Sequence, residues 1–304
     1  MESRSYRITI KMLIGFILTR LMPQKTQRIK KSFALQYWGR GIGKNKISKR
    51  MESVIRFYLA HATKNRDDEL EKIHKHFWER QINLNWYEKS QQRFESSTLP
   101  VLEPHVKTLK AILENTHIST VCEIGTGDGM FLNHLRQTLH SPTNFIGLDL
   151  SAERIAFNSH QFPGLHFFAG DVFEWINHTS TDNTLYVTNG GVFEYSSQKT
   201  LTAFFNKIKL QQPGSIIALF HESLALDHKL STDNESRLTC GGEFSFSHNF
   251  PFLFKQAEFR VQHLEEENHP AGYRALTIIA SSSNLVNQSK VKKEAVDLQP
   301  VNAI

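Results

Sequence analysis

Three glycines at alternate positions, Gly125, Gly127 and Gly129, follow a short apolar run that contains Glu123. Glycine lets the backbone turn tightly and pass close to a ligand because it has no Cβ. A helix that begins behind such a loop presents unpaired N–H groups to a polar ligand group. The dinucleotide pattern G-x-G-x-x-G needs a third glycine where this chain has Met130. The spacing therefore favours E-x-G-x-G-x-G over an NAD fingerprint.

Acidic side chains also follow the next two apolar runs. Asp149 ends the second run, 26 residues after Glu123, and Asp171 follows the third run. A carboxylate at the end of the second strand accepts the hydroxyls of a ribose. The carboxyl ends of parallel strands meet in one crevice, so we expect the three acids to converge there. Asp128 and Ser151 are interpreted as helix N-caps.

Short apolar runs alternate with helical patterns around these residues, which predicts βαβ units and a buried parallel sheet. The last two strands have a short connection, which predicts an antiparallel pair. The predicted fold class is α/β: a Rossmann-like doubly wound seven-stranded sheet with an antiparallel C-terminal hairpin, preceded by a helical N-terminal region. The expected strands are 120–124, 144–149, 165–169, 184–188, 215–220, 259–264 and 274–280, and the expected helices 104–114, 129–138, 152–159, 172–176, 198–209 and 250–256.

Residues 119–281 resemble the class I S-adenosylmethionine (SAM)-dependent methyltransferases. The similar features are E-x-G-x-G-x-G, an acidic end to the second strand, Gly-Asp after the third strand and a sheet that closes with a hairpin. Within that family, the chain is most similar to stand-alone bacterial enzymes without an assigned substrate. The resemblance implies SAM as the cofactor, and it is not specific for the methyl acceptor.

The resemblance also implies a role for each cofactor-binding residue. The three loop glycines would surround the methionine part of SAM, and Glu123 would face its amino group. Asp149 would hold the ribose hydroxyls. Asp171 would bind the adenine amino group, with Val172 against the ring.

The segment after the fourth strand begins Asn189-Gly190-Gly191. Methyltransferases that act on exocyclic amino groups of nucleic acids typically carry Asn/Asp-Pro-Pro-aromatic here. Two glycines replace the prolines, so nucleobase N-methylation loses support, and we expect Asn189 to line the cofactor pocket. Phe193 and Tyr195 either wall the acceptor site or pack behind a Gly-Gly turn.

Two histidines are candidate general bases, His221 after the fifth strand and His248 before a later helix. Methyl transfer from a sulfonium needs a close, in-line approach of the nucleophile. A hydroxyl acceptor also benefits from a base, whereas a neutral amine attacks unaided. Glu222 is positioned to orient either imidazole. The alternative is that each histidine is structural.

Charge is distributed unevenly along the chain, whose net charge is +6. Residues 1–50 contain thirteen Lys/Arg and one acid, whereas residues 119–281 contain ten Lys/Arg and seventeen Asp/Glu. An acidic catalytic region suits a cationic sulfonium cofactor better than a polyanionic acceptor.

Three interpretations of the basic arm remain open. In the first, residues 8–31 contact an anionic membrane surface, with an interfacial helix over residues 8–22 and basic residues that flank it. In the second, the arm grips nucleic acid, with the aromatic residues of 33–38 as stacking surfaces, although its dense apolar cluster makes this less favoured. In the third, the apolar face of the arm packs on the methyltransferase body and its charges are only solvated. The apolar run 12–19 is too short to span a bilayer.

Cys122 and Cys240 match no disulfide framework or metal-ligand spacing, so we expect a cytoplasmic protein without a metal site. The expected domains are a basic amphipathic arm (1–50), a helical region (51–118), the methyltransferase domain (119–281) and a disordered tail (282–304).

These observations predict a SAM-dependent methyltransferase that modifies an oxygen or nitrogen of a small-molecule, glycan or lipid-linked acceptor. Its expected location is the cytoplasm or the inner face of a membrane. The alternatives are an RNA methyltransferase that uses the basic arm, and a non-catalytic SAM-binding or scaffold protein.

Overall fold

The computed structural model describes residues 2–31, 46–62, 67–80, 90–114, 116–140, 142–179, 182–238, 245–269 and 273–282. The chain divides into two compact units. Unit 1 comprises Met1–Arg80, Tyr195–Ser197 and Arg237–Ser247, and unit 2 comprises Gln81–Glu194, Gln198–Ser236 and His248–Ile304. The expected boundary at residue 50 lies inside one helix, α3 (Lys46–Ala62). The predicted tail beyond residue 282 lies outside the described residues.

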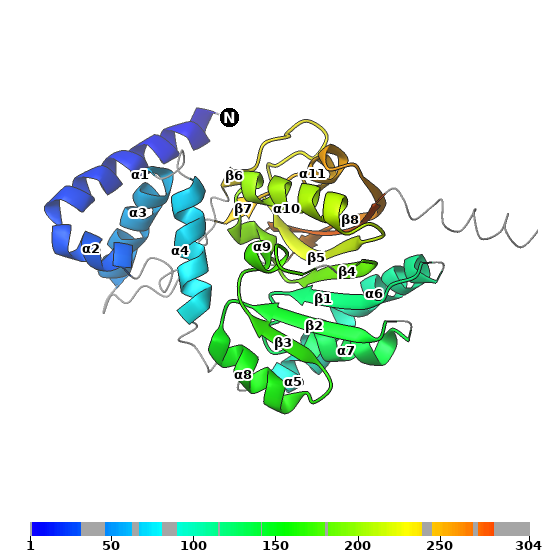
Figure 1. Ribbon diagram of the computed structural model, residues 1–304. Coiled ribbons are helices and arrows are strands. Elements are labelled where there is room, and N and C mark those ends of the chain that lie inside the picture. The colour runs from blue at the N-terminus through cyan, green and yellow to red at the C-terminus, as the bar shows by residue number, and fades with distance from the viewer. Residues whose placement is uncertain are drawn as a thin grey trace, which may run out of the picture. The chain divides into compact units, whose positions relative to one another are not determined.

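A seven-stranded sheet forms the centre of unit 2, in the order β3-β2-β1-β4-β5-β9-β8 (Figure 1). The first five strands in this order are parallel, and β9 pairs antiparallel with both β5 and β8. The predicted fold class, including the C-terminal hairpin, is confirmed. The strands are β1 (Thr120–Ile124), β2 (Asn144–Asp149), β3 (His166–Ala169), β4 (Thr184–Asn189), β5 (Ile216–Leu224), β8 (Phe259–His269) and β9 (Tyr273–Ser282).

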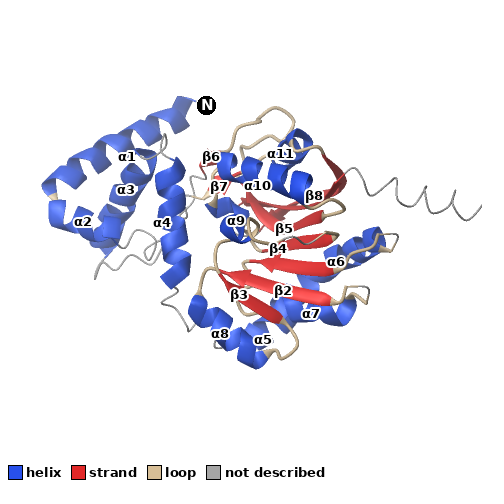
Figure 2. Ribbon diagram, viewed as in Figure 1, coloured by secondary structure: helices blue, strands red, loops and turns tan. Residues whose placement is uncertain are grey.

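Helices cover both faces of this sheet (Figure 2). One hydrophobic core lies under α6 and α7, and the other under α9, α10 and α11. The helical elements of unit 2 are α5 (Ser90–Arg93), the π-helical turn η2 (Phe94–Thr98), α6 (Leu99–Leu113), α7 (Met130–Thr138), α8 (Ala152–Gln161), α9 (Val172–Trp175), α10 (Gln198–Gln211) and α11 (Phe250–Gln256); the short 3-10 helix η3 (Phe193–Tyr195) runs from unit 2 into unit 1.

The central strand β1 shows why the apolar runs are continuous rather than alternating. All five of its residues are buried. Val121 packs into the α6–α7 core and Cys122 into the opposite core. A parallel sheet with helices on both faces requires apolar residues on both faces. Burial also raises the pKa of the Cys122 thiol, so this cysteine is an inert core residue.

Apart from β8, which was expected to end at residue 264 and continues to His269, two predicted boundaries are wrong by four residues or more. Pro104 was expected to begin a helix, but α6 begins at Leu99 and Pro104 lies inside it. The proline in the first turn is Pro100, where the missing N–H costs no hydrogen bond. The second error is β5, which continues to Leu224 through a register shift that apolar patterning does not predict.

Among its described residues, unit 1 contains four α-helices and a two-stranded sheet. Ile29, Ile55, Phe57, Leu70 and Phe246 form its core. Helix α1 crosses α3 closely at Gly15, where an added Cβ would overlap the Cβ of Tyr58. The elements are α1 (Glu2–Leu21), α2 (Pro23–Lys31), α3, α4 (Asp67–Arg80), β6 (Arg237–Leu238) and β7 (Phe246–Ser247).

A buried carboxylate joins part of the basic arm to α3. Glu52 is fully buried, and its Oε1 lies 3.3 Å from Lys25 Nζ and 3.4 Å from Arg28 Nη2. Part of the positive charge of the arm is therefore paired inside unit 1, whereas the packing interpretation expected the charges to be only solvated. The aromatic residues of 33–38, on which the nucleic-acid interpretation depends, lie outside the described residues.

Candidate cofactor and acceptor site

The loop between β1 and α7 has the conformation that the glycine spacing predicts. Gly125, Gly127 and Gly129 have φ of 70°, 52° and 72°, in the left-handed region that favours glycine. An added Cβ on Gly125 would also lie 2.7 Å from Cγ2 of Val192, which follows β4. This position therefore excludes a side chain both by backbone conformation and by space.

Hydrogen bonds hold the loop on the end of β2. The Thr126 amide donates to the Leu148 carbonyl at 2.9 Å. The Gly127 amide donates to Asp149 Oδ2 at 2.9 Å, and the Gly127 carbonyl accepts from Asn158 Nδ2 at the same distance. The glycine loop and the acid at the end of the second strand are therefore one structural unit.

Asp149 is 8% exposed, and both of its oxygens accept backbone hydrogen bonds. Oδ2 accepts from Gly127, and Oδ1 accepts from Ser151 at 2.9 Å. Burial raises the pKa of Asp149, while these two bonds and the nearby Arg154 oppose the rise. An ionised carboxylate has about four acceptor sites, so it still has capacity for ribose hydroxyls. Ser151 caps α8 as predicted.

Glu123, near the end of β1, is 2% exposed and accepts a 2.6 Å hydrogen bond from Thr126 Oγ1. Burial raises its pKa well above the ordinary value. The predicted cap at Asp128 needs correction: Gly129 occupies the N-cap position of α7. The Asp128 carboxylate instead accepts from the Met130 amide at 3.2 Å.

The end of β3 supplies the third acid. Asp171 caps α9 by accepting from the Phe173 amide at 2.9 Å, and Val172 beside it is buried. An added Cβ on Gly170 would meet no atom within 4 Å, and the same is true of Gly190 after β4. Strands β3, β2 and β1 are neighbours in the sheet, so Asp171, Asp149 and Glu123 lie side by side at the carboxyl ends of the strands. Open space lies beyond the ends of β3 and β4.

The end of β4 is tied to β5. Asn189 is half-buried, and the next amide, of Gly190, donates to the Phe220 carbonyl at 3.0 Å. Glu222 is fully buried on the other side of the bulge in β5, where Thr188 Oγ1 donates to it at 2.9 Å. Burial raises the pKa of Glu222 to about 7, opposed by hydrogen bonds from Thr188 and the backbone of 192–194. These contacts fix the β4 loop; none of them orients an imidazole.

The aromatic residues after β4 are packing residues. Phe193 is 1% exposed and packs against Phe204 in the α9–α11 core. Tyr195 belongs to unit 1, where its ring lies 5.2 Å from that of His74 and 5.4 Å from that of Trp78. The packing alternative therefore describes both residues better than an acceptor wall.

His248, one of the two candidate bases, is buried with both ring nitrogens in contact with partners. Its Nε2 lies 3.2 Å from the Phe193 carbonyl, which only accepts, so Nε2 carries the proton. Its Nδ1 lies 2.5 Å from Ser236 Oγ and accepts from that hydroxyl. This arrangement is typical of a structural histidine.

His221, the other candidate, lies at the bulge in β5 with φ of 56°. Its ring meets the ring of His105, on α6, at a centroid distance of 4.9 Å and an angle of 73°. Glu267 of β8 lies beside both. The sequence analysis did not select His105 or Glu267. The signal that would have found the glutamate is the alternation of His263, Glu265 and Glu267 along one strand.

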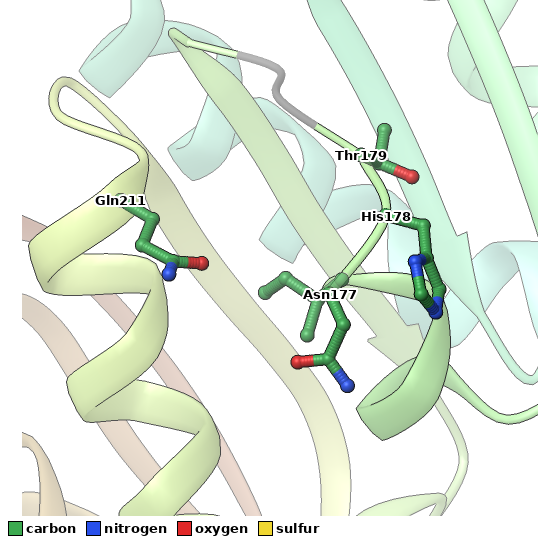
Figure 3. Close-up of a pocket in the computed structure, with 5 residues that line it drawn as sticks. Asn177, His178, Thr179 and Gln211 are labelled. Carbon is green, nitrogen blue, oxygen red and sulfur yellow. The ribbon is translucent and has the colours of Figure 1, made fainter.

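A separate pocket of 310 Å³ lies near the amino ends of β4 and β5 (Figure 3). It is bounded by the segment after α9 and by the end of α10, and both precede the strands that they lead into. It is therefore distant from the glycine loop and is not the cofactor site. Its lining residues are Ile176, Asn177, His178, Thr179 and Gln211.

No protein-family model and no curated protein matches the chain. Solved structures similar to it include a SAM-dependent methyltransferase from Leishmania major, at 17% identity over 58% of this chain and 69% of that chain, with a TM-score of 0.45. Magnesium protoporphyrin IX methyltransferase from Synechocystis with bound SAM is 11% identical over 84% and 97%, with a TM-score of 0.42. The N-methyltransferase NodS from Bradyrhizobium japonicum, in complex with S-adenosyl-L-homocysteine, is 15% identical over 60% and 86%, with a TM-score of 0.43. All three solved structures are of methyltransferases.

Proposed function

We propose that unit 2 binds SAM and transfers its methyl group to a small-molecule, glycan or lipid-linked acceptor. The observation that carries the proposal is the 2.9 Å hydrogen bond from the Gly127 amide to Asp149. It joins a left-handed glycine loop to the acid that would bind a ribose, on a sheet edge that also carries Glu123 and Asp171. The open space beyond Gly170 and Gly190 lies at the same edge.

The residues at this edge fit the parts of SAM in order along the sheet. The glycine loop at β1 would surround the methionine part, with Glu123 toward the ammonium group. Asp149 at β2 would accept the ribose hydroxyls, and Asp171 and Val172 at β3 would hold the adenine. Asn189 at β4 would line the side of the pocket nearest the acceptor.

When bound, SAM supplies an electrophilic methyl group on a sulfonium. The chain has to hold the acceptor in line with that methyl group and keep water out. The excess of acids in residues 119–281 favours a cationic cofactor over a polyanionic acceptor. The Gly-Gly sequence after Asn189 gives no support to a nucleobase amine, so the proposal is a small acceptor rather than RNA. His221 remains the candidate residue on the acceptor side.

Titration calorimetry of the full chain with SAM tests the proposal. We expect wild-type binding and at least a tenfold loss of affinity in Asp149→Asn, because the amide removes the charge and one acceptor. The matched control is Asp182→Asn, an exposed acid just before β4 at the opposite sheet edge. Absence of binding by the wild type, or equal losses in the two variants, would refute the proposal.

Transfer of a labelled methyl group to low-molecular-weight, lipid and RNA fractions of a cell extract then separates the acceptor classes. Label in the first two fractions supports the proposal, and label confined to RNA contradicts its acceptor class. SAM binding without transfer to any fraction would favour the non-catalytic alternative.

A second proposal concerns α1: we infer that it contacts an anionic membrane surface. Met12, Gly15 and Leu18 face α3 and the unit 1 core. A stripe on the helix remains exposed instead, with Leu13 at 60% and Leu21 at 73% exposure. The full stripe is Ile10, Leu13, Ile14, Ile17 and Leu21.

Basic side chains flank this stripe, as is typical of interfacial helices. Lys11 and Arg20 lie beside it and are exposed. Among the described residues, no helix has both the length and the apolar character that a membrane crossing requires. The proposal is therefore a peripheral contact, with the apolar stripe in the interface and the charges near headgroups.

Co-sedimentation of the full chain with phosphatidylcholine vesicles, with and without phosphatidylserine, tests this contact. We expect binding that needs the anionic lipid and that Leu13→Asp with Leu21→Asp abolishes. Leu210→Asp is the matched control, because Leu210 is an isolated leucine on α10 that is 82% exposed. Equal loss in the control, no vesicle binding, or binding to RNA that the double variant removes would contradict the proposal.

A further inference from the structure

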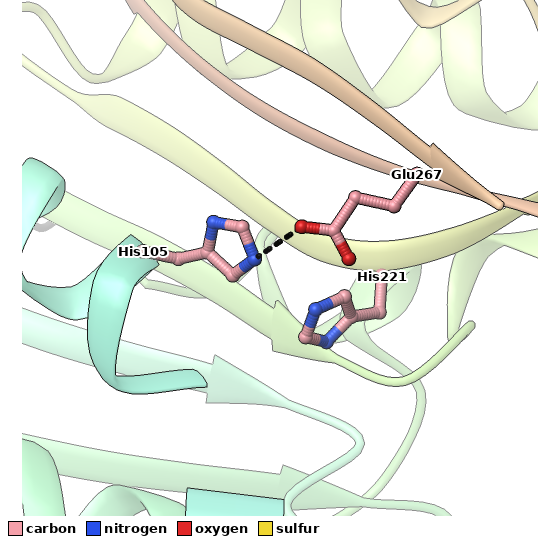
Figure 4. A group of neighbouring side chains, drawn as sticks. All are labelled: His105, His221 and Glu267. Carbon is pink, nitrogen blue, oxygen red and sulfur yellow. Dashed lines mark ion pairs between the residues drawn. The ribbon is translucent and has the colours of Figure 1, made fainter. Parts of the chain in front are cut away.

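Two histidines and a glutamate from three distant segments meet on the α6 side of the sheet (Figure 4). His105 comes from α6, His221 from the bulge in β5 and Glu267 from β8. One nitrogen or oxygen from each residue lies within 4.8 Å of the others. Figure 4 shows the three side chains pointing toward one another, with His105 Nε2 3.8 Å from Glu267 Oε1.

The surroundings hold His105 in this position. It is 2% exposed, and its ring stacks on Phe220 at 6.0 Å between centroids. Its Nδ1 lies 3.5 Å from Glu265 Oε2, so the other ring nitrogen, Nε2, is the one that faces Glu267.

The backbone is strained where it delivers His221. A non-glycine residue with φ of 56° costs free energy, and such residues persist where the surrounding structure imposes them. The bulge also redirects the side chain: His221 faces α6, whereas Glu222 faces the β4 loop. Bulges that redirect a side chain are common beside functional sites.

We propose that His105, His221 and Glu267 bind a divalent transition-metal ion of the zinc class. Two imidazoles and one carboxylate are a donor set that zinc takes in proteins, with a fourth position open to water or a ligand. The separation of the ligand atoms leaves room for an ion between them.

Another His–Glu contact in unit 2 shows what distinguishes this group from an ordinary ion pair. His134 Nε2 lies 3.5 Å from Glu103 Oε2. There, a half-buried histidine meets one carboxylate, with no second imidazole within metal-ligand reach among the described residues. In the proposed site two imidazoles and a carboxylate converge, and one imidazole is buried.

A second group of three residues, His105, His263 and Glu265, is the main alternative to the proposed metal site. His263 Nε2 lies 3.4 Å from Glu265 Oε2, which lies 3.5 Å from His105 Nδ1. Its two members on β8, His263 and Glu265, share one face of the strand because side chains alternate along a strand. We assign the metal to the triad with His221, because only that triad includes a strained residue.

This inference does not rest on the proposed methyl transfer. Where both hold, the metal changes the role of His221 from base to ligand. The spacing of the cysteines predicted no metal site. Three single residues from separate segments have no recognisable spacing.

Titration of the full chain, freed of any affinity tag, with Zn²⁺ tests the site. Co²⁺ in place of zinc gives a visible d–d spectrum that reports the coordination geometry. We expect one equivalent to bind and an affinity at least tenfold lower in His221→Gly and in Glu267→Gln. Glycine relieves the backbone strain at residue 221, so loss of binding there will not be caused by unfolding. Thermal melts of each variant verify this.

His134→Gln and Glu266→Gln are the matched controls and should bind zinc like the wild type. The first removes a histidine from an ordinary His–Glu pair. The second removes a carboxylate from the same strand, where it pairs with Arg274. The assignment is overturned if wild-type protein binds no zinc, if controls and site variants lose affinity equally, or if only His263→Gln and Glu265→Gln lose it.

Discussion

The glycine-loop edge and the histidine cluster are both candidate sites of unit 2, but they are built in opposite ways. Residues 123–129 are contiguous, and backbone hydrogen bonds to Leu148 and Asp149 hold them in place. The cluster takes one residue from each of α6, β5 and β8. The first site depends on the backbone conformation of one contiguous loop, whereas the second depends on side chains from three separate segments. Substitutions should therefore affect folding and binding together at the first site and separately at the second.

The largest expected effect is at Gly125. Gly125→Ala combines left-handed backbone strain with the contact to Val192, and we expect it to lower the free energy of unfolding by about 3 kcal/mol. Gly190→Ala has a similar φ of 82° but nothing within 4 Å of the new Cβ, so it should cost about 1 kcal/mol. Urea denaturation measures both, and equal losses would show that Val192 does not constrain the loop.

The second effect is a pH dependence at Glu123. Its raised pKa means that the folded state keeps a proton that the unfolded state loses near the ordinary value of 4.5. Its contribution to stability is therefore fully present below pH 4.5 and is lost as pH rises through the folded-state pKa. The slope for one proton is at most about 1.4 kcal/mol per pH unit. Glu123→Gln should flatten the curve above pH 4.5, and an unchanged slope would contradict this.

At the cluster, a gain in stability should accompany a loss of binding. His221→Gly relieves a left-handed non-glycine residue and should raise the free energy of unfolding by about 1 kcal/mol in the absence of metal. The zinc titration on the same variant then separates the two effects. A destabilised glycine variant would show that the contacts of the ring outweigh the strain.

The smallest effect is expected at the contact between His134 and Glu103, the ordinary His–Glu pair of unit 2. His134→Gln breaks a half-exposed contact with Glu103, and we expect it to change the free energy of unfolding by no more than about 0.5 kcal/mol. Chemical denaturation in parallel with the other variants measures it. A change of several times this size would mean that lone His–Glu contacts in unit 2 stabilise the fold more than the comparison assumes.

The fold and the tight turn of the glycine loop could be predicted from sequence because their signals are local. Strands β1 and β2 have the bounds that the apolar runs predict, and Ser151 caps α8 as expected. The glycine loop makes its tight turn with left-handed φ values, which glycine adopts cheaply. These features depend on residues within one turn or strand of each other.

What could not be predicted depends on tertiary contacts. The extension of β5 past Phe220 needs β9 as a partner, so its apolar run alone ends too early. Phe193 and Tyr195 are two residues apart in sequence but belong to different units. His105 and Glu267 are 162 residues apart, and only the sheet and α6 bring them together.

The discontinuity of unit 1 has a consequence for how the protein is made. Its four helices precede residue 81, but Phe246, a member of their core, is synthesised 166 residues after Arg80. At 5–20 residues per second the ribosome needs roughly 10–30 s to reach it. During that interval the helices of the basic arm have left the ribosome without the strand that completes their core. The helices of unit 1 therefore complete their core only after Phe246 has been made, although they are made before any strand of unit 2.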